Sequence, residues 1–153
     1  MARPTLLAGD MGGTKTLLAL YDLEGEALIK RHQQRFVSAD WSSLEPMLQA
    51  FVEERPKDVQ APTHGCIAVA GPVRNRQARI TNLPWQLKEE DLAAAAGMQQ
   101  LELVNDFGVL IYGLPPFGAA QQVVLQEGSQ DDGPLAILGA GTGLGMARGV
   151  RTN

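Results

Sequence analysis

Three strand-like segments lie within residues 5–36, and their close spacing constrains the fold more than any other feature of the chain. TLLAG at 5–9, TLLALYD at 16–22 and ALIKRHQQRF at 27–36 each predict a strand. The connections between them, DMGGTK and LEGE, are short and contain glycine. Strands joined by so few residues pair antiparallel, so the N-terminal part of the chain is predicted to be a β-meander.

A helix is predicted after the meander, in the segment SLEPMLQAFVEE. Its apolar positions fall on one helical face, namely Leu44, Met47, Leu48, Phe51 and Val52. Because Pro46 is tolerated only in a first turn, the helix is predicted to begin near Ser43.

Strands and helices alternate in the rest of the chain. HGCIAVAGPV predicts a fourth strand, RNRQARITNLPW an irregular segment, LKEEDLAAAA a helix that ends at Gly97, and LELV at 101–104 a fifth strand. NDFGVLIYGLPP predicts a short helix ending at Gly113, SQDDG an exposed turn, and PLAILGAGTGLGMARG a strand running into a second glycine-rich turn. This order predicts an α/β fold with a five-stranded mixed sheet and flanking helices.

Composition and charge exclude several classes of function. The 153 residues are 44% hydrophobic and 20% charged, which is typical of a soluble globular protein. A net charge of −4 without a Lys/Arg cluster argues against nucleic acid and anionic membranes as partners. The single cysteine, Cys66, excludes an internal disulfide and fits a reducing cytoplasm. The N-terminus has no signal-peptide pattern and no apolar run could span a bilayer, so a cytoplasmic location is expected.

Two glycine-rich turns, DMGGTK and GAGTGLG, could bind phosphate, because glycines let several main-chain N–H groups approach one anion. Neither has the spacing of a Walker A loop or of a dinucleotide-binding fingerprint. Taken alone, each is better interpreted as a hairpin turn that needs a positive φ.

Side chains beside the first turn shift this balance toward phosphate. Asp10 ends a strand predicted to be buried, where a divalent cation such as Mg²⁺ would compensate an otherwise costly carboxylate. Thr14 adds a hydroxyl and Lys15 a cation beside Gly12 and Gly13. For Lys15, a solvated lysine at a strand end remains an alternative of nearly equal weight.

Asn105 and Asp106 follow the fifth predicted strand at the start of a helix. Because Asn and Asp are favoured helix caps, capping is one interpretation. In the other, Asp106 is a general base that takes a proton from a substrate hydroxyl, and Asn105 donates a hydrogen bond. The helix N-terminus favours the ionised carboxylate that a base requires. In the nearby TNLPW, 81–85, Asn82 offers an amide that suits a sugar, whereas Trp85 is interpreted as a core residue.

Other polar residues are expected to have no role in a site. His32 and His64 are interpreted as surface residues, and Cys66 as a small buried hydrophobe. The charge run 89–91 is interpreted as a solvated helix face.

Five motifs in order, DMGGTK, AGPV, ITNLPW, VNDF and GAGTGLGMA, resemble those of bacterial glucokinases. The resemblance extends from residue 5 to about residue 149 and implies a ribonuclease-H-like fold of the sugar kinase/actin/Hsp70 superfamily. It implies ATP as co-substrate, Mg²⁺ near Asp10, and glucose as acceptor. The two phosphate loops would then be residues 10–15 and 139–145.

The resemblance also implies roles for individual residues. Asp106 corresponds to the base that deprotonates the sugar 6-hydroxyl, Asn82 and Asn105 to sugar contacts, and Gly71 to the main-chain rim of that pocket. In the second loop, Gly141, Thr142 and Gly143 would bind the phosphates of ATP, with Thr142 and Gly143 near the transferred phosphoryl group.

The match ends just after the second loop, so residues 1–153 are expected to be the N-terminal small lobe of a two-lobe sugar kinase. The family's adenosine site and remaining sugar contacts lie on a second lobe. Three alternatives stay open: a kinase for mannose, N-acetylmannosamine or another hexose, an enzyme that uses ADP or polyphosphate as donor, and a sugar-binding or regulatory module without kinase activity. Binding of glucose by the chain without phosphorylation would support the module. An oligomer of the whole enzyme, if one forms, is expected to be a homodimer.

A lobe without its partner should expose apolar groups that the second lobe would cover. The isolated chain is therefore expected to self-associate or to be only marginally stable. Sedimentation velocity at several concentrations measures this, and a monomeric, highly soluble chain would contradict it.

Overall fold

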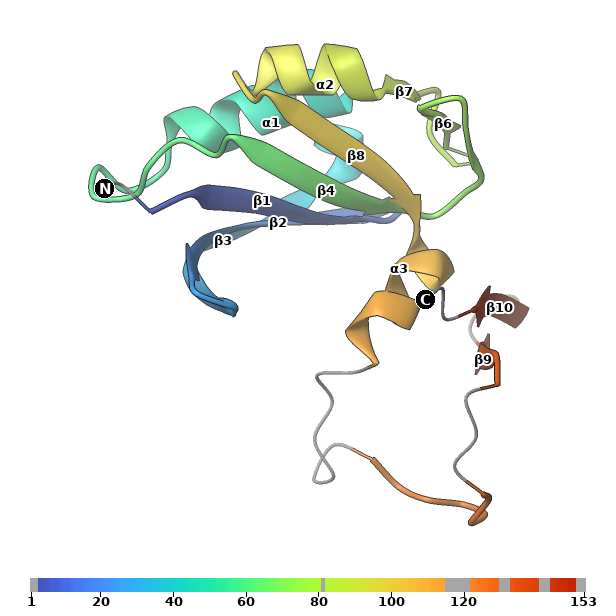
Figure 1. The fold of residues 1–153 in the computed structure, drawn as a ribbon. Coiled ribbons are helices and arrows are strands. Elements are labelled where there is room, and N and C mark those ends of the chain that lie inside the picture. Colours follow the sequence, from blue (N-terminus) through green and yellow to red (C-terminus); the bar gives the residue numbers. More distant parts are fainter. Residues whose placement is uncertain (1–2, 81, 115–121, 130–132, 141–143, 151–153) are drawn as a thin grey trace. The chain divides into compact units, whose positions relative to one another are not determined.

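The structure is a computed structural model that describes residues 3–80, 82–114, 122–129, 133–140 and 144–150. The chain forms two compact units, Met1–Asn105 and Asp106–Asn153, each considered by itself (Figure 1). In the described ranges, no helix is long and apolar enough to cross a membrane.

The first unit is built on a five-stranded mixed sheet. Its strands are β1 (Thr5–Met11), β2 (Lys15–Glu24), β3 (Ala27–Val37), β4 (His64–Val69) and β8 (Gln100–Asn105), in the order β3-β2-β1-β4-β8. The first three pair antiparallel, which confirms the predicted meander. β4 runs parallel to β1, and β8 runs parallel to β4.

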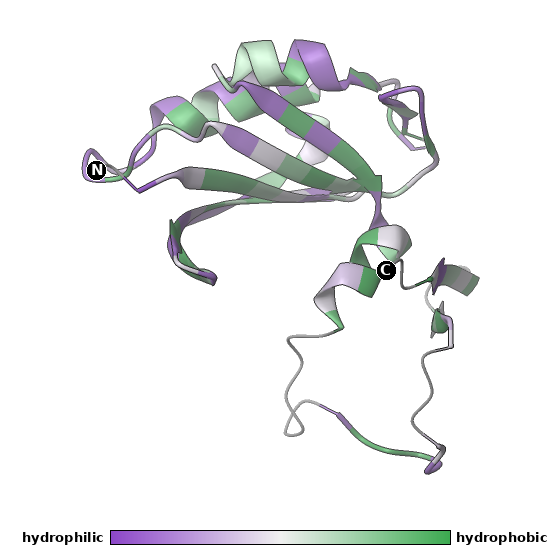
Figure 2. Ribbon diagram, viewed as in Figure 1, coloured by the Kyte–Doolittle hydropathy of each residue, from purple (hydrophilic) through white to green (hydrophobic). Residues whose placement is uncertain are grey.

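Helices α1 (Leu44–Glu53) and α2 (Glu89–Ala95) lie on the same side of this sheet (Figure 1). Ser43 occupies the N-cap position of α1, and the five apolar residues predicted to share a face are all buried. They join the alternate strand residues that face the same core, among them Leu7, Leu18, Ile67 and Leu103. Figure 2 shows the apolar residues concentrated along these strands.

The predicted end of α2 at Gly97 is confirmed. Gly97 has a φ of +65°, the left-handed conformation that glycine adopts without steric cost. The Met98 N–H donates to the Ala93 carbonyl at 2.8 Å, and the Gly97 N–H to the Ala94 carbonyl at 3.1 Å. This pair of hydrogen bonds is a Schellman motif, which satisfies carbonyls at the end of the helix.

The prediction of an irregular segment before α2 is wrong. This part of the chain forms a second sheet, with β5 (Val73–Arg74), β6 (Gln77–Arg79) and β7 (Gln86–Lys88) in the order β5-β6-β7. Asn75 and Arg76 connect β5 to β6 with φ values of 51° and 61°, as a two-residue hairpin turn requires. The signal was missed because the turn holds no glycine, and because the predicted helix included Leu87 and Lys88, which belong to β7.

The prediction that residues 89–91 form a solvated helix face is wrong for Glu89, which is buried. Glu90 and Asp91 are exposed, as the prediction requires. The Glu89 side chain is 7% exposed, and its two oxygens accept hydrogen bonds from the Leu103 N–H at 3.0 Å and from the Arg76 Nε at 2.7 Å. β8 is an edge strand, so the Leu103 N–H has no strand partner on that side. Glu89 supplies the missing acceptor and connects the second sheet to the first.

His32 is also placed differently from the prediction. Its imidazole is half-buried and stacks on the Phe51 ring, with 5.1 Å between the centroids. His64 is exposed and Trp85 is buried in the core, as predicted. Cys66 is half-buried, and burial, followed by the charges of Glu102 and Glu89, raises the pKa of its thiol.

The second unit contains helix α3 (Asp106–Gly113) and an antiparallel hairpin of β9 (Leu135–Ala140) and β10 (Leu144–Gly149). The predicted helix and the strand entering the second glycine turn are confirmed. α3 packs on the hairpin through the Phe107 ring, and a Cβ on Gly145 would lie only 2.0 Å from that ring. Most of the predicted SQDDG turn, residues 130–132, lies outside the described residues.

Replacement of Glu89 tests the buried connection between the two sheets. We expect Glu89→Ala to lower the free energy of unfolding by about 2 kcal/mol, because the buried Leu103 N–H loses its acceptor. Urea denaturation followed by circular dichroism measures the change. The matched control, Arg76→Ala, removes only the exposed partner of Glu89 and should lower the free energy of unfolding by less than Glu89→Ala does. Equal losses in the two variants would contradict this role.

Candidate functional site

Three strands of the main sheet end in one row. Met11 of β1 is the register partner of Val69 in β4, and Val69 is the register partner of Asn105 in β8. The carboxyl ends of parallel strands are where open α/β sheets place their ligands. The predicted site residues Gly12–Lys15 follow the end of β1, and Gly71 follows the end of β4. Asn105 is itself the last residue of β8.

The segment Gly12–Lys15 forms a tight turn between β1 and β2, in which the Gly12 N–H donates to the Lys15 carbonyl at 2.9 Å. The predicted hairpin turn is confirmed, but neither Gly12 nor Gly13 has a positive φ, so the expectation that this turn needs one is wrong. Gly13 is needed for space instead. A Cβ at this position would lie 3.1 Å from the Asn82 Cβ and 3.2 Å from its Nδ2. The fold therefore brings a predicted phosphate residue against a predicted sugar residue.

Asp10 is exposed, which corrects the prediction of a buried carboxylate. Successive side chains of a strand point to opposite faces of a sheet. Asp10 alternates with the buried Met11 and so lies on the face away from the helices. Its carboxylate does not need a cation to compensate burial, but it is accessible to one. In the described ranges, no three His, Cys, Asp or Glu side chains cluster to hold a metal ion by themselves. Thr14 and Lys15 are exposed as well.

Asn105 and Gly71 are in direct contact, as neighbours in a shared site should be. The Asn105 Nδ2 donates to the Gly71 carbonyl at 3.0 Å, a contact between residues 34 apart in the chain. Main-chain hydrogen bonds hold the same corner, from the Gly71 N–H to the Val69 carbonyl at 2.9 Å and from the Ala70 N–H to the Met11 carbonyl at 3.2 Å. Asn105 thus orients the main chain that leaves β4.

Asp106 follows Asn105 in the chain and is the first residue of α3. One of its carboxylate oxygens accepts the Phe107 N–H at 2.9 Å. This hydrogen bond satisfies a donor of the first helical turn, although a capping side chain normally accepts the N–H two or three residues further on. It engages one oxygen of a carboxylate that has two, and a capping role does not exclude a chemical one.

The remaining predicted residues, Gly141, Thr142 and Gly143, lie outside the described residues. Their flanking strands β9 and β10 are described and pair from Ala140 and Leu144 outward. The role of this loop stays a prediction.

Sequence reasoning missed Ser38, which follows β3. Ser38 is buried and contacts the Gly12–Lys15 turn through both its main chain and its hydroxyl. No motif marks this serine, because its partners are more than twenty residues away in the chain.

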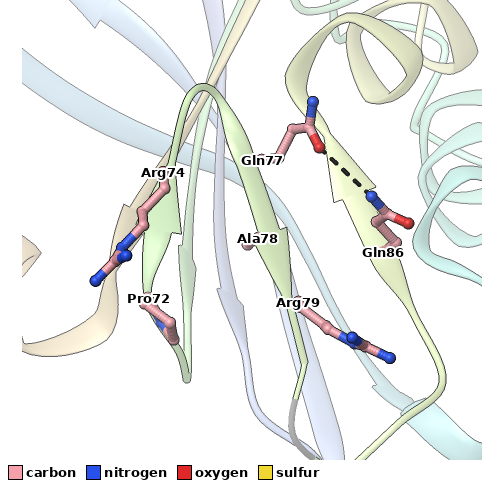
Figure 3. Close-up of a pocket in the computed structure, with 6 residues that line it drawn as sticks. All are labelled: Pro72, Arg74, Gln77, Ala78, Arg79 and Gln86. Carbon is pink, nitrogen blue, oxygen red and sulfur yellow. Dashed lines mark hydrogen bonds between the residues drawn. The ribbon is translucent and has the colours of Figure 1, made fainter.

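A separate pocket of about 260 Å³ lies on the second sheet and is lined by Pro72, Arg74, Gln77, Ala78, Arg79 and Gln86 (Figure 3). The Gln86 Nε2 donates to the Gln77 Oε1 at 3.4 Å along one side. The Arg74 and Arg79 side chains extend in different directions in Figure 3, so they do not converge on one anion. Among the predicted site residues that the structure describes, none lines this pocket.

The sequence pattern of the protein family described as Glucokinase matches residues 7–153. The chain is 39% identical over 146 residues to a glucokinase of Nostoc sp., and 41% identical over 148 residues to a glucokinase of Trichormus variabilis. Each alignment covers 92% of this chain but only 42% of the relative, so the chain spans less than half of their length.

Among solved structures, the chain is similar to a glucokinase from an Antarctic psychrotroph, with a TM-score of 0.84 and 32% identity. The match covers 99% of this chain and 48% of the solved one. The predicted α/β fold of the actin-like ATPase class, with its five-stranded mixed sheet, is therefore confirmed.

The close approach at Gly13 can be tested directly. We expect Gly13→Ala to displace the Asn82 side chain, because the added Cβ would lie 3.1 Å from that of Asn82. The Asn82 side-chain NH₂ signal in a ¹⁵N-correlation spectrum should shift, while thermal stability changes little because Asn82 is exposed. Gly128→Ala, at a position with open space around it, is the control and should leave that signal in place. An unmoved Asn82 signal in Gly13→Ala would contradict the contact.

Proposed function

This chain belongs to the glucokinase family, and from that membership we propose that the whole protein transfers the γ-phosphoryl group of ATP to the 6-hydroxyl of glucose. The observation that carries the proposal is the meeting of a glycine turn with Asn82, Gly71 and Asn105 at one sheet edge. Residues 1–153 are proposed to be the N-terminal small lobe, and the further length of the relatives is proposed to supply the second. The proposed location is the cytoplasm.

On the phosphate side, the Gly12–Lys15 turn is proposed to bind ATP. Its main-chain N–H groups and the exposed Thr14 hydroxyl would donate to phosphate oxygens, and the Lys15 ammonium would offset their charge. The loop containing Gly141, Thr142 and Gly143 is proposed to contact the transferred phosphoryl group.

The exposed Asp10 carboxylate is suited to bind a Mg²⁺ ion that accompanies ATP. Mg²⁺ usually keeps several waters and is bound through one or two carboxylates and substrate phosphates. When bound, the ion would neutralise charge on the phosphate oxygens. Asp10 would hold it, directly or through a water molecule.

On the sugar side, Asn82, Asn105 and the main chain at Gly71 are proposed to bind glucose hydroxyls. Asn105 already holds the Gly71 carbonyl, so the two would present a shared rim to the sugar. Asp106, next in the chain, is proposed as the general base. It would accept the proton of the 6-hydroxyl as that oxygen forms its bond to the γ-phosphorus and the bond to the ADP oxygen breaks. Closure of the two lobes would exclude water as a competing acceptor.

The base assignment is tested by Asp106→Asn in the whole protein. We expect turnover to fall by at least about 100-fold, because the amide cannot accept the proton, while glucose affinity stays within a few-fold. A coupled assay for ADP measures turnover, and calorimetry measures glucose binding. Glu102→Gln, an exposed carboxylate of the neighbouring strand, is the control and should keep normal turnover. Near-normal turnover in Asp106→Asn would refute the assignment. The same assay with mannose and N-acetylmannosamine identifies the preferred acceptor.

A further inference from the structure

We propose that Ser38 is a positioning residue that sets the direction of the main-chain N–H groups in the Gly12–Lys15 turn. The inference rests on the proposed phosphate-binding role of that turn. Ser38 is the first residue of a short 3₁₀ helix, Ser38–Asp40, which follows β3 directly. It is 0% exposed, so it can contribute only by holding other groups.

Ser38 makes three hydrogen bonds to the turn and to the start of β2. Its N–H donates to the Thr14 carbonyl at 3.0 Å, and its hydroxyl donates to the Gly12 carbonyl at 3.2 Å. Its Oγ also lies 3.1 Å from the Thr16 Oγ1. A serine hydroxyl has one proton, and Gly12 takes it, so the Thr16 hydroxyl must be the donor to Ser38. The hydrogen bonds therefore run from Thr16 through Ser38 to Gly12.

The turn is closed by the hydrogen bond from the Gly12 N–H to the Lys15 carbonyl, and the contacts of Ser38 engage the Gly12 carbonyl that a second closing bond would use. In many β-turns the carbonyl of the first residue accepts the N–H of the fourth, here Gly12 and Lys15. In the described part of the chain, the Gly12 carbonyl accepts the Ser38 hydroxyl instead. In this part of the chain, the Lys15 N–H therefore does not donate to the Gly12 carbonyl.

The planarity of the peptide bond converts this anchoring into a direction for the N–H groups. The described peptide bonds are all trans, and a trans peptide points its C=O and N–H to opposite sides. Since the Gly12 and Thr14 carbonyls point at Ser38, the N–H groups of Gly13 and Lys15 point away from it. A phosphate bound by the turn would need main-chain N–H donors held in a fixed direction toward it. Ser38 thus fixes the orientation of two of them before any ligand arrives.

A substitution at Thr16 is the matched control for loss of a buried hydroxyl that does not itself hold the Gly12 carbonyl. Thr16 is as fully buried as Ser38 and belongs to the same hydrogen-bonded chain. Thr16→Val removes one buried hydroxyl but leaves the Ser38 hydroxyl on the Gly12 carbonyl. Ser38→Ala removes the anchor itself and lets the peptide that follows Gly12 rotate. Ser38→Cys keeps a weaker donor at nearly the same volume and serves if the alanine variant does not fold.

The first experiment does not depend on enzymatic activity. It measures the amide signals and hydrogen-exchange rates of the turn by ¹⁵N-correlation spectra of the full chain. We expect Ser38→Ala to shift the Gly13 and Lys15 amide signals and to speed their exchange, and Ser38→Cys to do so less. Thr16→Val should leave both signals near their original positions. Equal changes in Ser38→Ala and Thr16→Val, or none in either, would overturn the inference.

The second experiment measures kinetics of the whole protein with ATP and glucose. Because a misplaced binding group can cost up to about 100-fold in rate, we expect Ser38→Ala to lower kcat/KM for ATP by about 10- to 100-fold. The KM for glucose should change by a few-fold at most and by less than kcat/KM for ATP, because Asn105 donates to the Gly71 carbonyl and not to the turn. Thr16→Val should retain nearly all of its kcat/KM for ATP. An active Ser38→Ala enzyme with unchanged ATP kinetics would overturn the inference. If the unaltered protein phosphorylated no sugar, the proposed function would fail, and the amide signals would still decide whether Ser38 orients the turn.

Discussion

The main-chain pairing of β1 on both of its edges is the constraint on which the rest of the structure depends. β2 pairs with it antiparallel and β4 pairs with it parallel, so β1 lies inside the sheet and its hydrogen bonds are satisfied on both sides. The parallel pairings of β1 with β4 and of β4 with β8 bring Met11, Val69 and Asn105 into one row. The loops that follow these strands then emerge at a common edge. A shift of either register would separate the residues of the proposed phosphoryl-transfer site.

Single hydrogen bonds from side chains to the main chain hold the segments around this edge. Ser38 holds the Gly12–Lys15 turn, Asn105 holds the corner at Gly71, and Glu89 satisfies the free edge of β8. All three acceptors or donors on the main chain lie outside the regular ladder of the sheet, where a strand partner cannot reach them. Such anchoring would suit the proposed phosphoryl transfer, which depends on placing two substrates and on fixed dipoles, because reorganisation at the moment of transfer would raise the barrier.

The two carboxylates that sequence reasoning placed in the wrong environment show how burial depends on context. Asp10 was expected to be buried because it ends an apolar run, yet alternation along β1 turns it to the face away from the helices. Glu89 was expected to be solvated because it lies in a charge run at a helix start. It is buried because an edge strand and the hairpin turn at Arg76 both need its oxygens. Neither outcome follows from the residues adjacent in sequence.

By itself, the sequence determined the elements whose signals are local. The meander follows from short connections, the buried face of α1 from its apolar spacing, the end of α2 from Gly97, and family membership from five motifs in order. Only the tertiary structure decided which groups meet. Ser38 reaches Gly12 across 26 residues and Asn105 reaches Gly71 across 34. Periodicity reports the conformation within one element, whereas these contacts depend on strand register and on how separate segments pack.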